Sequence, residues 1–517
     1  MPSGLDQATA RLRAHLLATV DPAGALRSPC DSRVLETALC LRLLERSGLR
    51  PDAQASLKAY LSRRRDASER LDRALVTAAL EQAQGLSGAG FGEFLTRAPG
   101  FTSHRKQAMI TGILSLFGVP ATEPDPAVFS HEGLHIWAKV QVTALKVITY
   151  RALRRTGELL DGDYDLLAST QNLPDLWEGN VLIHLSVLHA LVGMPGTAAV
   201  VEHGAEQVLR HQRADGGLPF VTDTDTWTTA TGGVALSALG APPAALHRMA
   251  GHLVGQQRSN GGWAYTDLAE QTDVDDISVA TEFLHGLDPD RYASAVDAAL
   301  AHLRGIVGAS GGFPTYVKDA PAEACMTAAA VNALGVRSAL HEPLIRDGLR
   351  YLDRAQHADG SFGPDWSASS LHTVFRAVLA AGQGGSEAGP EALRVRHRAL
   401  ERVIGTQNPD GGWGWTPDHP SDAVSTAYAL IALCAQDDPG PVAAGLGHLL
   451  SCQRADGSVE STSDSIGPRP FVFRVAALAD VFCGLALGHV ASRLEPERGR
   501  VTAPRYAAAS SVAPVRP

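Results

Sequence analysis

The sequence has few of the features that mark disulfide-rich, membrane-spanning or nucleic-acid-binding proteins. Its 517 residues include only six cysteines and no Cys-x-x-Cys pair, so we expect reduced thiols and a cytoplasmic protein. No segment approaches the roughly 18 consecutive apolar residues of a membrane span, and the N-terminus lacks the apolar core of a signal peptide. A net charge of −10 argues against nucleic acid as a partner.

The composition is that of an ordinary globular protein, and the strand pattern of alternating polar and apolar residues is almost absent. Hydrophobic residues make up 45% of the chain and charged residues 19%, and the length suits two or more domains. Apolar residues instead recur at helical spacing in stretches such as 326–335 and 424–433. This pattern predicts an all-α fold.

A motif of the form Gln-x-x-x-Gly-x-aromatic recurs along the chain. Its copies, some of them degraded, begin at Gln171, Gln212, Gln257, Val307, Gln356, Gln407 and Gln453, between 41 and 51 residues apart. Each copy lies between an amphipathic helical stretch and an Ala/Leu-rich one, and a fixed period of this size indicates stacked units of two helices. The glycines permit positive φ, and the glutamine amide can bridge exposed backbone groups. We therefore interpret the motif as structural and expect helix pairs closed into (α/α) barrels.

One repeat carries charge that the others lack. Asp273, Asp275 and Asp276 place three carboxylates in four residues at the start of an apolar helical stretch. A single aspartate there is explained as a helix N-cap, but three like charges repel one another. Burying them all ionised would cost several kcal/mol, so at least one should hold a proton. A protonated carboxylic acid facing an apolar cavity can add H⁺ to a carbon–carbon double bond.

The sequence Asp273-Val274-Asp275-Asp276, together with the repeats, resembles the class II terpene cyclases, which include squalene–hopene and copalyl diphosphate-type cyclases. The resemblance spans at least residues 171–459. It implies that Asp275 is the proton donor and that Asp273 and Asp276 tune its acidity. We expect an apolar cavity and the two carboxylate neighbours to keep the proton on Asp275. The helix dipole would stabilise the carboxylate that is left behind.

The resemblance also implies two packed helical barrels of the βγ type. We expect an N-terminal barrel over residues 1–239, whose first forty or so residues pack back on the second barrel. The second barrel, over residues 240–494, carries the Asp motif, and the Ala/Ser/Pro-rich tail 495–517 is expected to be disordered.

The substrate implied by the resemblance is a linear prenyl diphosphate that is closed to a bicyclic diphosphate. It is either geranylgeranyl diphosphate or farnesyl diphosphate, the latter giving a drimane-type product. No DDxxD motif of the class I enzymes is present, so the diphosphate should stay attached. Aromatic residues beside the repeat turns are candidates for stabilising the cation. They are Trp227, Trp263, Tyr265, Phe313, Tyr316, Trp366, Trp413 and Trp415.

A diphosphate needs positively charged partners. The candidate side chains are Arg105, Lys106 and Lys318, and Mg²⁺ is the expected cofactor, bound with the substrate diphosphate. Candidate metal ligands are Asp31, Glu36 and Glu132. A homodimer is left open.

Two other functions remain open from the sequence. The β-subunits of protein prenyltransferases share the helical-barrel architecture and hold zinc through an Asp-x-Cys motif and a later His. Here Glu323-Ala-Cys325 and His372 approximate that set. A non-catalytic α/α barrel that only binds a ligand is the other alternative.

Overall fold

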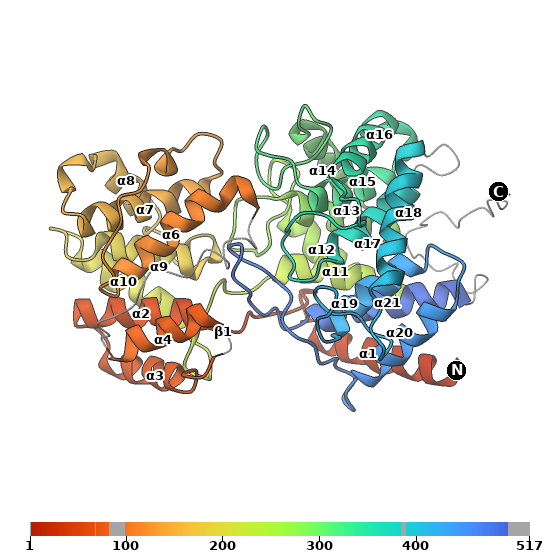
Figure 1. Ribbon diagram of the computed structural model, residues 1–517, viewed down its shortest axis with the longest axis horizontal. Helices are drawn as coiled ribbons and strands as arrows, with labels where there is room; N and C mark the ends of the chain where they lie inside the picture. Colours follow the sequence, from red (N-terminus) through yellow and green to blue (C-terminus); the bar gives the residue numbers. More distant parts are fainter. Residues whose placement is uncertain (1, 68, 82–98, 384–388, 495–517) are drawn as a thin grey trace. The chain divides into compact units, whose positions relative to one another are not determined.

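The computed structural model describes residues 2–67, 69–81, 99–383 and 389–494 (Figure 1). They divide into two compact units. Unit 1 takes the residues up to Ser28, Thr224–Ile466 and those from Val475 onward; unit 2 takes Pro29–Asp223 and Gly467–Arg474. Both units are helical. The described strands are β1 (Ser32–Arg33) and β2 (Leu218–Pro219), which pair antiparallel in unit 2.

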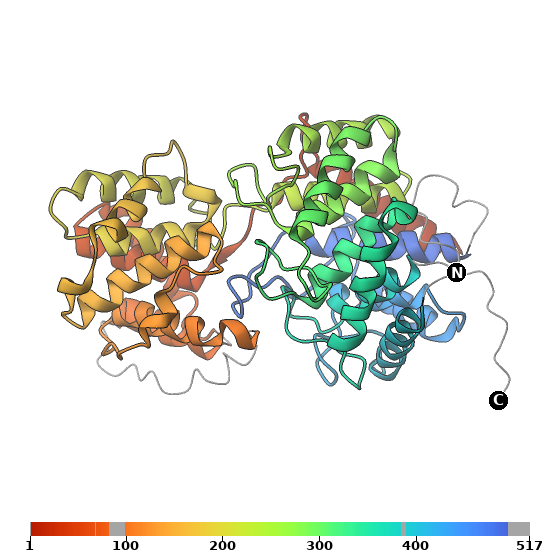
Figure 2. The same cartoon turned by 90° about the horizontal axis from the view of Figure 1, so that it is seen from above.

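Unit 1 is a closed ring of inner helices surrounded by outer ones (Figures 1 and 2). Each inner helix packs against the next, and the last packs against the first. The inner helices are α11 (Asp225–Ala238), α13 (Val274–Leu287), α15 (Ala324–Gly335), α17 (His372–Gly382), α19 (Ala423–Leu433) and α21 (Leu478–Leu494). The outer helices are α12 (Pro243–Gln256), α14 (Ala293–Ile306), α16 (Ser338–Ala355), α18 (Pro390–Gly405), α20 (Gly440–Ser451) and α1 (Pro2–Thr19). The expected all-α barrel is confirmed.

Burial separates the two layers. Every residue of α19 is buried, whereas α18 buries only Ala392, Val395, Ala399 and Val403 along one stripe. An inner helix therefore needs apolar residues on all sides, and an outer helix needs them on one face only. This difference explains why Ala/Leu-rich and amphipathic stretches alternate along the sequence.

The repeat motif closes each turn through backbone hydrogen bonds. Gln257 Nε2 donates to the carbonyls of Gly261 and Ala295, both at 2.9 Å. The indole of Trp263 is fully buried, and its Nε1 donates to the carbonyl of Leu253 at 2.7 Å. Gln407 and Trp413 repeat the arrangement, so the structural interpretation of the motif is confirmed.

The first helix of the chain completes the ring. Gln453, in the last repeat, donates to the carbonyl of Ala8 in α1 at 3.0 Å. A Cβ on Gly457 would lie 2.6 Å from the carbonyl oxygen of Arg11. Since α1 also packs against α21 and α11, it takes the place that an outer helix fills in the other repeats.

Unit 2 is assembled from shorter helices. The helix α2 (Val34–Ser47) packs against α3 (Pro51–Ser62), α4 (Arg70–Glu81) and α9 (Val181–Leu191), and α7 (Ile136–Ala152) packs against α6 (Ser103–Ser115), α8 (Asp161–Ser169) and α9. The helix α10 (Ala198–Arg210) packs on α9. Short 3₁₀ turns are η1 (Gly100–Thr102), η2 (Pro126–Phe129), η3 (Thr156–Glu158) and η4 (Trp177–Gly179). Segment 467–474 belongs to this unit, where Arg33 Nη1 donates to the carbonyl of Gly467 at 2.6 Å.

The division of the chain differs from the boundary expected after residue 239. The helix α11 belongs to unit 1, because it packs against α13 and α21 and closes the inner ring. The expected return of the N-terminus holds for residues up to Ser28, whereas Pro29 and the following residues belong to unit 2. The tail expected to be disordered, 495–517, lies outside the described residues. Among the helices that the structure describes, none is long and apolar enough to cross a membrane.

The turn at Gly261 gives a test of the repeat. Gly261 has a φ of +85°, and an added Cβ would lie 2.5 Å from the carbonyl oxygen of Ala298. We expect Gly261→Ala to lower the free energy of unfolding by more than about 1 kcal/mol. Gly251→Ala, in the middle of α12 with nothing within 4 Å, should instead be neutral or stabilising by roughly 0.5–1 kcal/mol. Urea unfolding of both variants checks the pair, and equal effects would contradict the described turn.

Candidate active site

The Asp motif lies at the start of the inner helix α13. Asp273 is its N-cap, and its Oδ1 accepts a hydrogen bond from the backbone N–H of Asp276 at 2.9 Å. The preceding turn holds the motif in place, because Asp273 N–H donates to the carbonyl of Trp263 and Val274 N–H to that of Thr315. The repeat thus positions the carboxylates through its backbone.

Two of the three carboxyls are buried and share their surroundings. Asp273 is 7% exposed and Asp276 3% exposed. Burial raises the pKa of Asp273 to about 6. Burial and the neighbouring charge of Asp273 raise the pKa of Asp276 well above its ordinary value. The Oδ1 atom of Asp276 is fully buried and has no hydrogen-bond partner. The motif therefore holds a proton on the Asp273–Asp276 pair.

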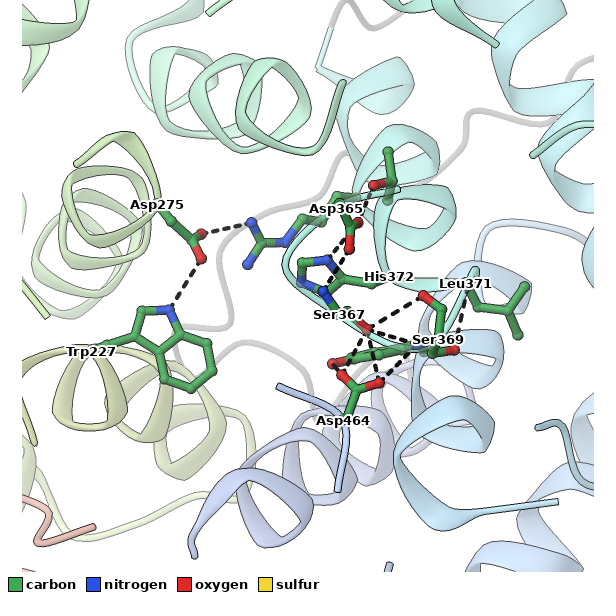
Figure 3. A network of polar contacts seen from close by, with 11 residues as sticks. Trp227, Asp275, Asp365, Ser367, Ser369, Leu371, His372 and Asp464 are labelled. Carbon is green, nitrogen blue, oxygen red and sulfur yellow. Dashed lines mark hydrogen bonds and ion pairs between the residues drawn. The ribbon is translucent and has the colours of Figure 1, made fainter. Parts of the chain in front are cut away.

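Asp275 has different surroundings from its neighbours (Figure 3). Its side chain is 18% exposed and accepts a hydrogen bond from Arg376 Nη1 at 2.6 Å and from Trp227 Nε1 at 3.2 Å. Burial alone would lower the pKa of Arg376, but the charge and hydrogen bond of Asp275 outweigh burial and hold the pKa of the guanidinium above its ordinary value. Burial was expected to keep the proton on Asp275, but the structure places the buried pair at Asp273 and Asp276 and gives Asp275 a cationic partner.

Arg376 is a residue that the sequence interpretation missed. It lies in α17, within the apolar stretch His372–Gly382, and its side chain is 8% exposed. A lone arginine inside an otherwise apolar inner helix is a signal that could have been read, because a buried charge requires a partner.

A network of hydrogen bonds lies around the start of α17, the helix that carries Arg376 (Figure 3). Asp365 accepts hydrogen bonds from Ser367 N–H at 2.7 Å, from His372 Nδ1 at 3.0 Å and from Thr373 Oγ1. Asp464 accepts from Ser367 Oγ, Ser369 N–H and Tyr428 OH, at 2.7 to 2.9 Å. Both carboxylates are buried, so both depend on these donors.

The predicted aromatic residues fall into two groups. Trp263, Trp413 and Phe313 are buried in the repeat turns. The indoles of Trp263 and Trp413 donate to the carbonyls of Leu253 and Val403 in their own repeats, so we assign them to the packing of the turns. Trp227, Tyr265, Tyr316, Trp366 and Trp415 are partly exposed and remain candidates. Beside Trp227 the structure adds rings that were not predicted, since Phe482, Tyr428 and Phe375 form a continuous cluster with centroids 4.9 to 6.1 Å apart.

Of the predicted cationic side chains, Lys106 is the one that fits an anion site. It is partly buried in unit 2 and has no hydrogen-bond or ion-pair partner among the described residues. Burial, with the nearby charge of Arg469, lowers the pKa of Lys106 to about 7. Arg105 is used in the fold, because it donates to the carbonyls of Val128 and Ser130, and Lys318 is exposed in unit 1.

The predicted magnesium ligands do not form a site. Glu36 is fully buried, and both its oxygens bind Arg33, so its charge is already compensated. The Oδ2 atom of Asp31 lies 3.5 Å from Nη1 of Arg474 and forms an ion pair with it. Within the described ranges, no three His, Cys, Asp or Glu side chains gather as metal ligands, and Asp31, Glu36 and Glu132 are therefore not brought together.

The zinc set of a prenyltransferase is not assembled either. His372 Nδ1 is engaged with Asp365, and Glu323 Oε1 accepts a hydrogen bond from Thr315. Cys325 is buried at 1% exposure within α15. These contacts leave no three-ligand group for zinc in the part of the chain that the structure describes.

Comparisons with known proteins agree with this site. Residues 315–492 match the squalene-hopene cyclase C-terminal domain. The chain is 38% identical over 502 residues to a drimenyl diphosphate synthase from Streptantibioticus cattleyicolor, covering 93% of each chain. It is 36% identical to a drimenyl diphosphate synthase from Streptomyces showdoensis, covering 94% of this chain and 95% of the relative. The solved structure of ent-copalyl diphosphate synthase from Streptomyces platensis has the same fold, with a TM-score of 0.57 at 19% identity over 94% of this chain and 99% of that chain.

A ring of helical repeats with an acidic cluster at the start of one inner helix defines a protonation-dependent cyclase, and the chain belongs to the class II terpene cyclase family. It is an enzyme. Within the family, two relatives named drimenyl diphosphate synthase match it over nearly its whole length.

The raised pKa of Asp273 predicts a pH-dependent stability. A carboxyl whose pKa is higher in the folded than in the unfolded chain costs stability as pH rises from about 4 to above 6. Asn preserves the N-cap, so we expect Asp273→Asn to raise the free energy of unfolding at pH 7.5 by up to roughly 3 kcal/mol, with no gain at pH 4. Urea unfolding at both pH values measures this.

Asp359→Asn is the control, because it should change the free energy of unfolding at pH 7.5 in the opposite direction. Its hydrogen bonds with Ser361 hold the pKa of Asp359 below its ordinary value, so this variant should lose stability at pH 7.5. A loss of stability in Asp273→Asn at pH 7.5 would contradict the protonated pair.

The Asp275–Arg376 ion pair predicts strong energetic coupling. Removing one partner leaves the other charge unpaired. In a double-mutant cycle of Asp275→Asn and Arg376→Met, we expect a coupling energy on the order of 1–3 kcal/mol in unfolding. The exposed pair Glu342–Arg346 on α16 is the matched control and should show far less coupling. Additive effects at Asp275 and Arg376 would mean that the two side chains do not interact.

Proposed function

We propose that this enzyme cyclises farnesyl diphosphate to a drimane-type bicyclic diphosphate. The observation that carries the proposal is the match, over nearly the whole chain, to two relatives named drimenyl diphosphate synthase. The residues alone leave the C15 and C20 substrates open, and these relatives favour the C15 substrate. The absence of a DDxxD motif supports a product that keeps its diphosphate.

In this proposal the Asp motif protonates the terminal alkene, and Asp275 delivers the proton. Its partial exposure, next to the more deeply buried Asp273–Asp276 pair, supports this assignment. The proton held by the buried pair passes to Asp275 and from Asp275 to the alkene, and Arg376 and Trp227 stabilise the carboxylate that Asp275 carries before and after the transfer. The rings of Trp227, Phe482, Phe375 and Tyr428 present π faces that can stabilise a carbocation.

Lys106 is the proposed partner of the substrate diphosphate. Three observations support an anion site: no described residue gives Lys106 a carboxylate partner, the charge of Arg469 is near, and the pKa of Lys106 is about 7. His135 belongs to the same cationic surroundings, since burial and the charge of Lys106 lower the pKa of His135 to about 3. A bound diphosphate would raise the pKa of Lys106 and restore its charge. Mg²⁺ would enter with the diphosphate, held mainly by the substrate's own oxygens.

Incubation with farnesyl and geranylgeranyl diphosphate, followed by phosphatase and mass spectrometry, tests the function. We expect the farnesyl substrate to be converted to a bicyclic alcohol after phosphatase, with no inorganic pyrophosphate released by the enzyme. Conversion of geranylgeranyl diphosphate alone would favour the C20 alternative. Released pyrophosphate would contradict the retention of the diphosphate.

Two variants in the same assay separate the two ends of the substrate. Asp275→Asn should lower kcat at least ~10²- to 10⁴-fold, since an amide cannot supply the acid proton. Lys106→Gln should mainly raise KM, because it weakens binding of the diphosphate without touching the acid. Near-normal turnover of Asp275→Asn would overturn its role as the donor.

A further inference from the structure

The Asp365–His372 pair lies close to the proposed acid and is not used by the protonation step. His372 is the first residue of α17 and is buried, with its side chain 6% exposed. Its Nδ1 lies 3.0 Å from Asp365 Oδ2 (Figure 3). An imidazole oriented by a carboxylate is a common arrangement for a general base.

The contacts of Asp365 decide which nitrogen of His372 carries the proton. Three donors converge on the buried carboxyl of Asp365, namely Ser367 N–H on Oδ1 and His372 Nδ1 and Thr373 Oγ1 on Oδ2. Asp365 is therefore an ionised acceptor, and Nδ1 of His372 must be the donor. In the neutral ring, Nε2 then carries a lone pair. That nitrogen makes no hydrogen bond to any residue that the structure describes.

His372 lies on the same face of α17 as the partner of the acid. Arg376 follows it by four residues, which places both side chains on one face of the helix, and Arg376 binds Asp275. The ring of His372 also lies against Phe375 and Tyr428, with centroids 5.7 and 5.3 Å away. A basic nitrogen is thus set among aromatic rings that stabilise a cation without trapping it.

The neighbouring carboxylate is a poorer candidate for a base. Asp464 accepts hydrogen bonds from Ser367, Ser369 and Tyr428. Its two oxygens are thereby engaged by donors that would have to be displaced before it could take a proton from carbon.

We propose that Nε2 of His372 accepts the proton that the bicyclic cation loses at the end of the reaction. This inference rests on the proposed function. A C–H bond beside the tertiary cationic carbon breaks, its electron pair forms the new C=C bond, and the proton moves to Nε2. The imidazolium is stabilised by Asp365, which acts as a positioning residue. One proton enters the substrate from the Asp motif and one leaves to His372, so the reaction is an isomerisation, and exchange with water restores both groups.

The variant His372→Asn tests this role directly. The Asn amide can keep the hydrogen bond to Asp365 that Nδ1 makes, but it removes the basic nitrogen. We expect formation of the native alkene to fall ~10²- to 10⁴-fold. The cation still forms, so part of the substrate should appear as hydroxylated bicyclic diphosphate or as isomeric alkenes. In H₂¹⁸O the hydroxylated product should carry the heavy oxygen.

Asp365→Asn tests the positioning role. It should shift the products in the same direction but less strongly, and lower kcat with little change in KM, because the imidazole remains but its tautomer is no longer fixed. His341→Gln is the matched control, since His341 is a buried histidine on the outer helix α16. It should leave the product ratio unchanged.

The outcomes separate the possible roles. An unchanged product ratio in both His372→Asn and Asp365→Asn, with turnover reduced or not, would overturn the proposal, because a structural or initiating residue changes rate without redirecting the cation. If His372→Asn does not fold, as judged by circular dichroism, the product ratio of Asp365→Asn decides. Failure of the unmodified enzyme to cyclise a prenyl diphosphate would instead reject the proposed function itself.

Discussion

The ring of unit 1 depends on the hydrogen bonds that four repeat glutamines each donate to two backbone carbonyls. At each of these glutamines the turn lies against the next outer helix, and the buried carbonyls at this contact need a hydrogen-bond donor. One amide at Gln257, Gln356, Gln407 or Gln453 satisfies a carbonyl of its own turn and one of the following outer helix. Because Gln453 finds its second carbonyl in α1, the ring closes only when the start of the chain returns to it.

Within this ring, charged residues on or beside the inner helices need an explanation. The inner helices bury most of their residues, and α19 buries all of them, so a buried charge there must be balanced locally. Asp275 is balanced by Arg376, and Asp365 by His372 with two further donors. The Asp273–Asp276 pair is balanced by retaining a proton. Asp273 also caps α13, whereas Asp275, Asp276 and Arg376 lie within inner helices, where repeat packing gives no reason for a charged residue. This supports a role for them in chemistry.

The sequence predicted the periodic part of the molecule well. The recurrence of Gln, Gly and an aromatic residue gave the helix pairs and the turns, because these residues act on backbone groups close in the chain. It also located the acidic cluster, since Asp273, Asp275 and Asp276 are nearly adjacent. It left open whether Trp263 and Trp413 line a site, and the structure decides this through hydrogen bonds to carbonyls ten residues earlier in each repeat.

What the sequence could not supply are partners that meet only in the folded chain. Arg376 lies 101 residues from Asp275, and no local pattern links them. His372 fitted a zinc motif by spacing, yet its neighbour is Asp365. The unit boundary was misplaced because α11 resembles any other inner helix, and only its packing against α21 assigns it to unit 1.

The arrangement around α13 and α17 resolves a conflict built into any acid that must protonate an alkene. Burial makes a carboxyl retain its proton, but the same burial makes it reluctant to release that proton. Here the two requirements fall on different residues: Asp273 and Asp276 are buried and retain a proton, and Asp275 has the cationic partner that stabilises a carboxylate. In the proposed mechanism, the imidazole of His372 adds the third requirement, a base reserved for the end of the reaction. A full turnover then leaves the net charge of the site unchanged, which suits surroundings of aromatic rings.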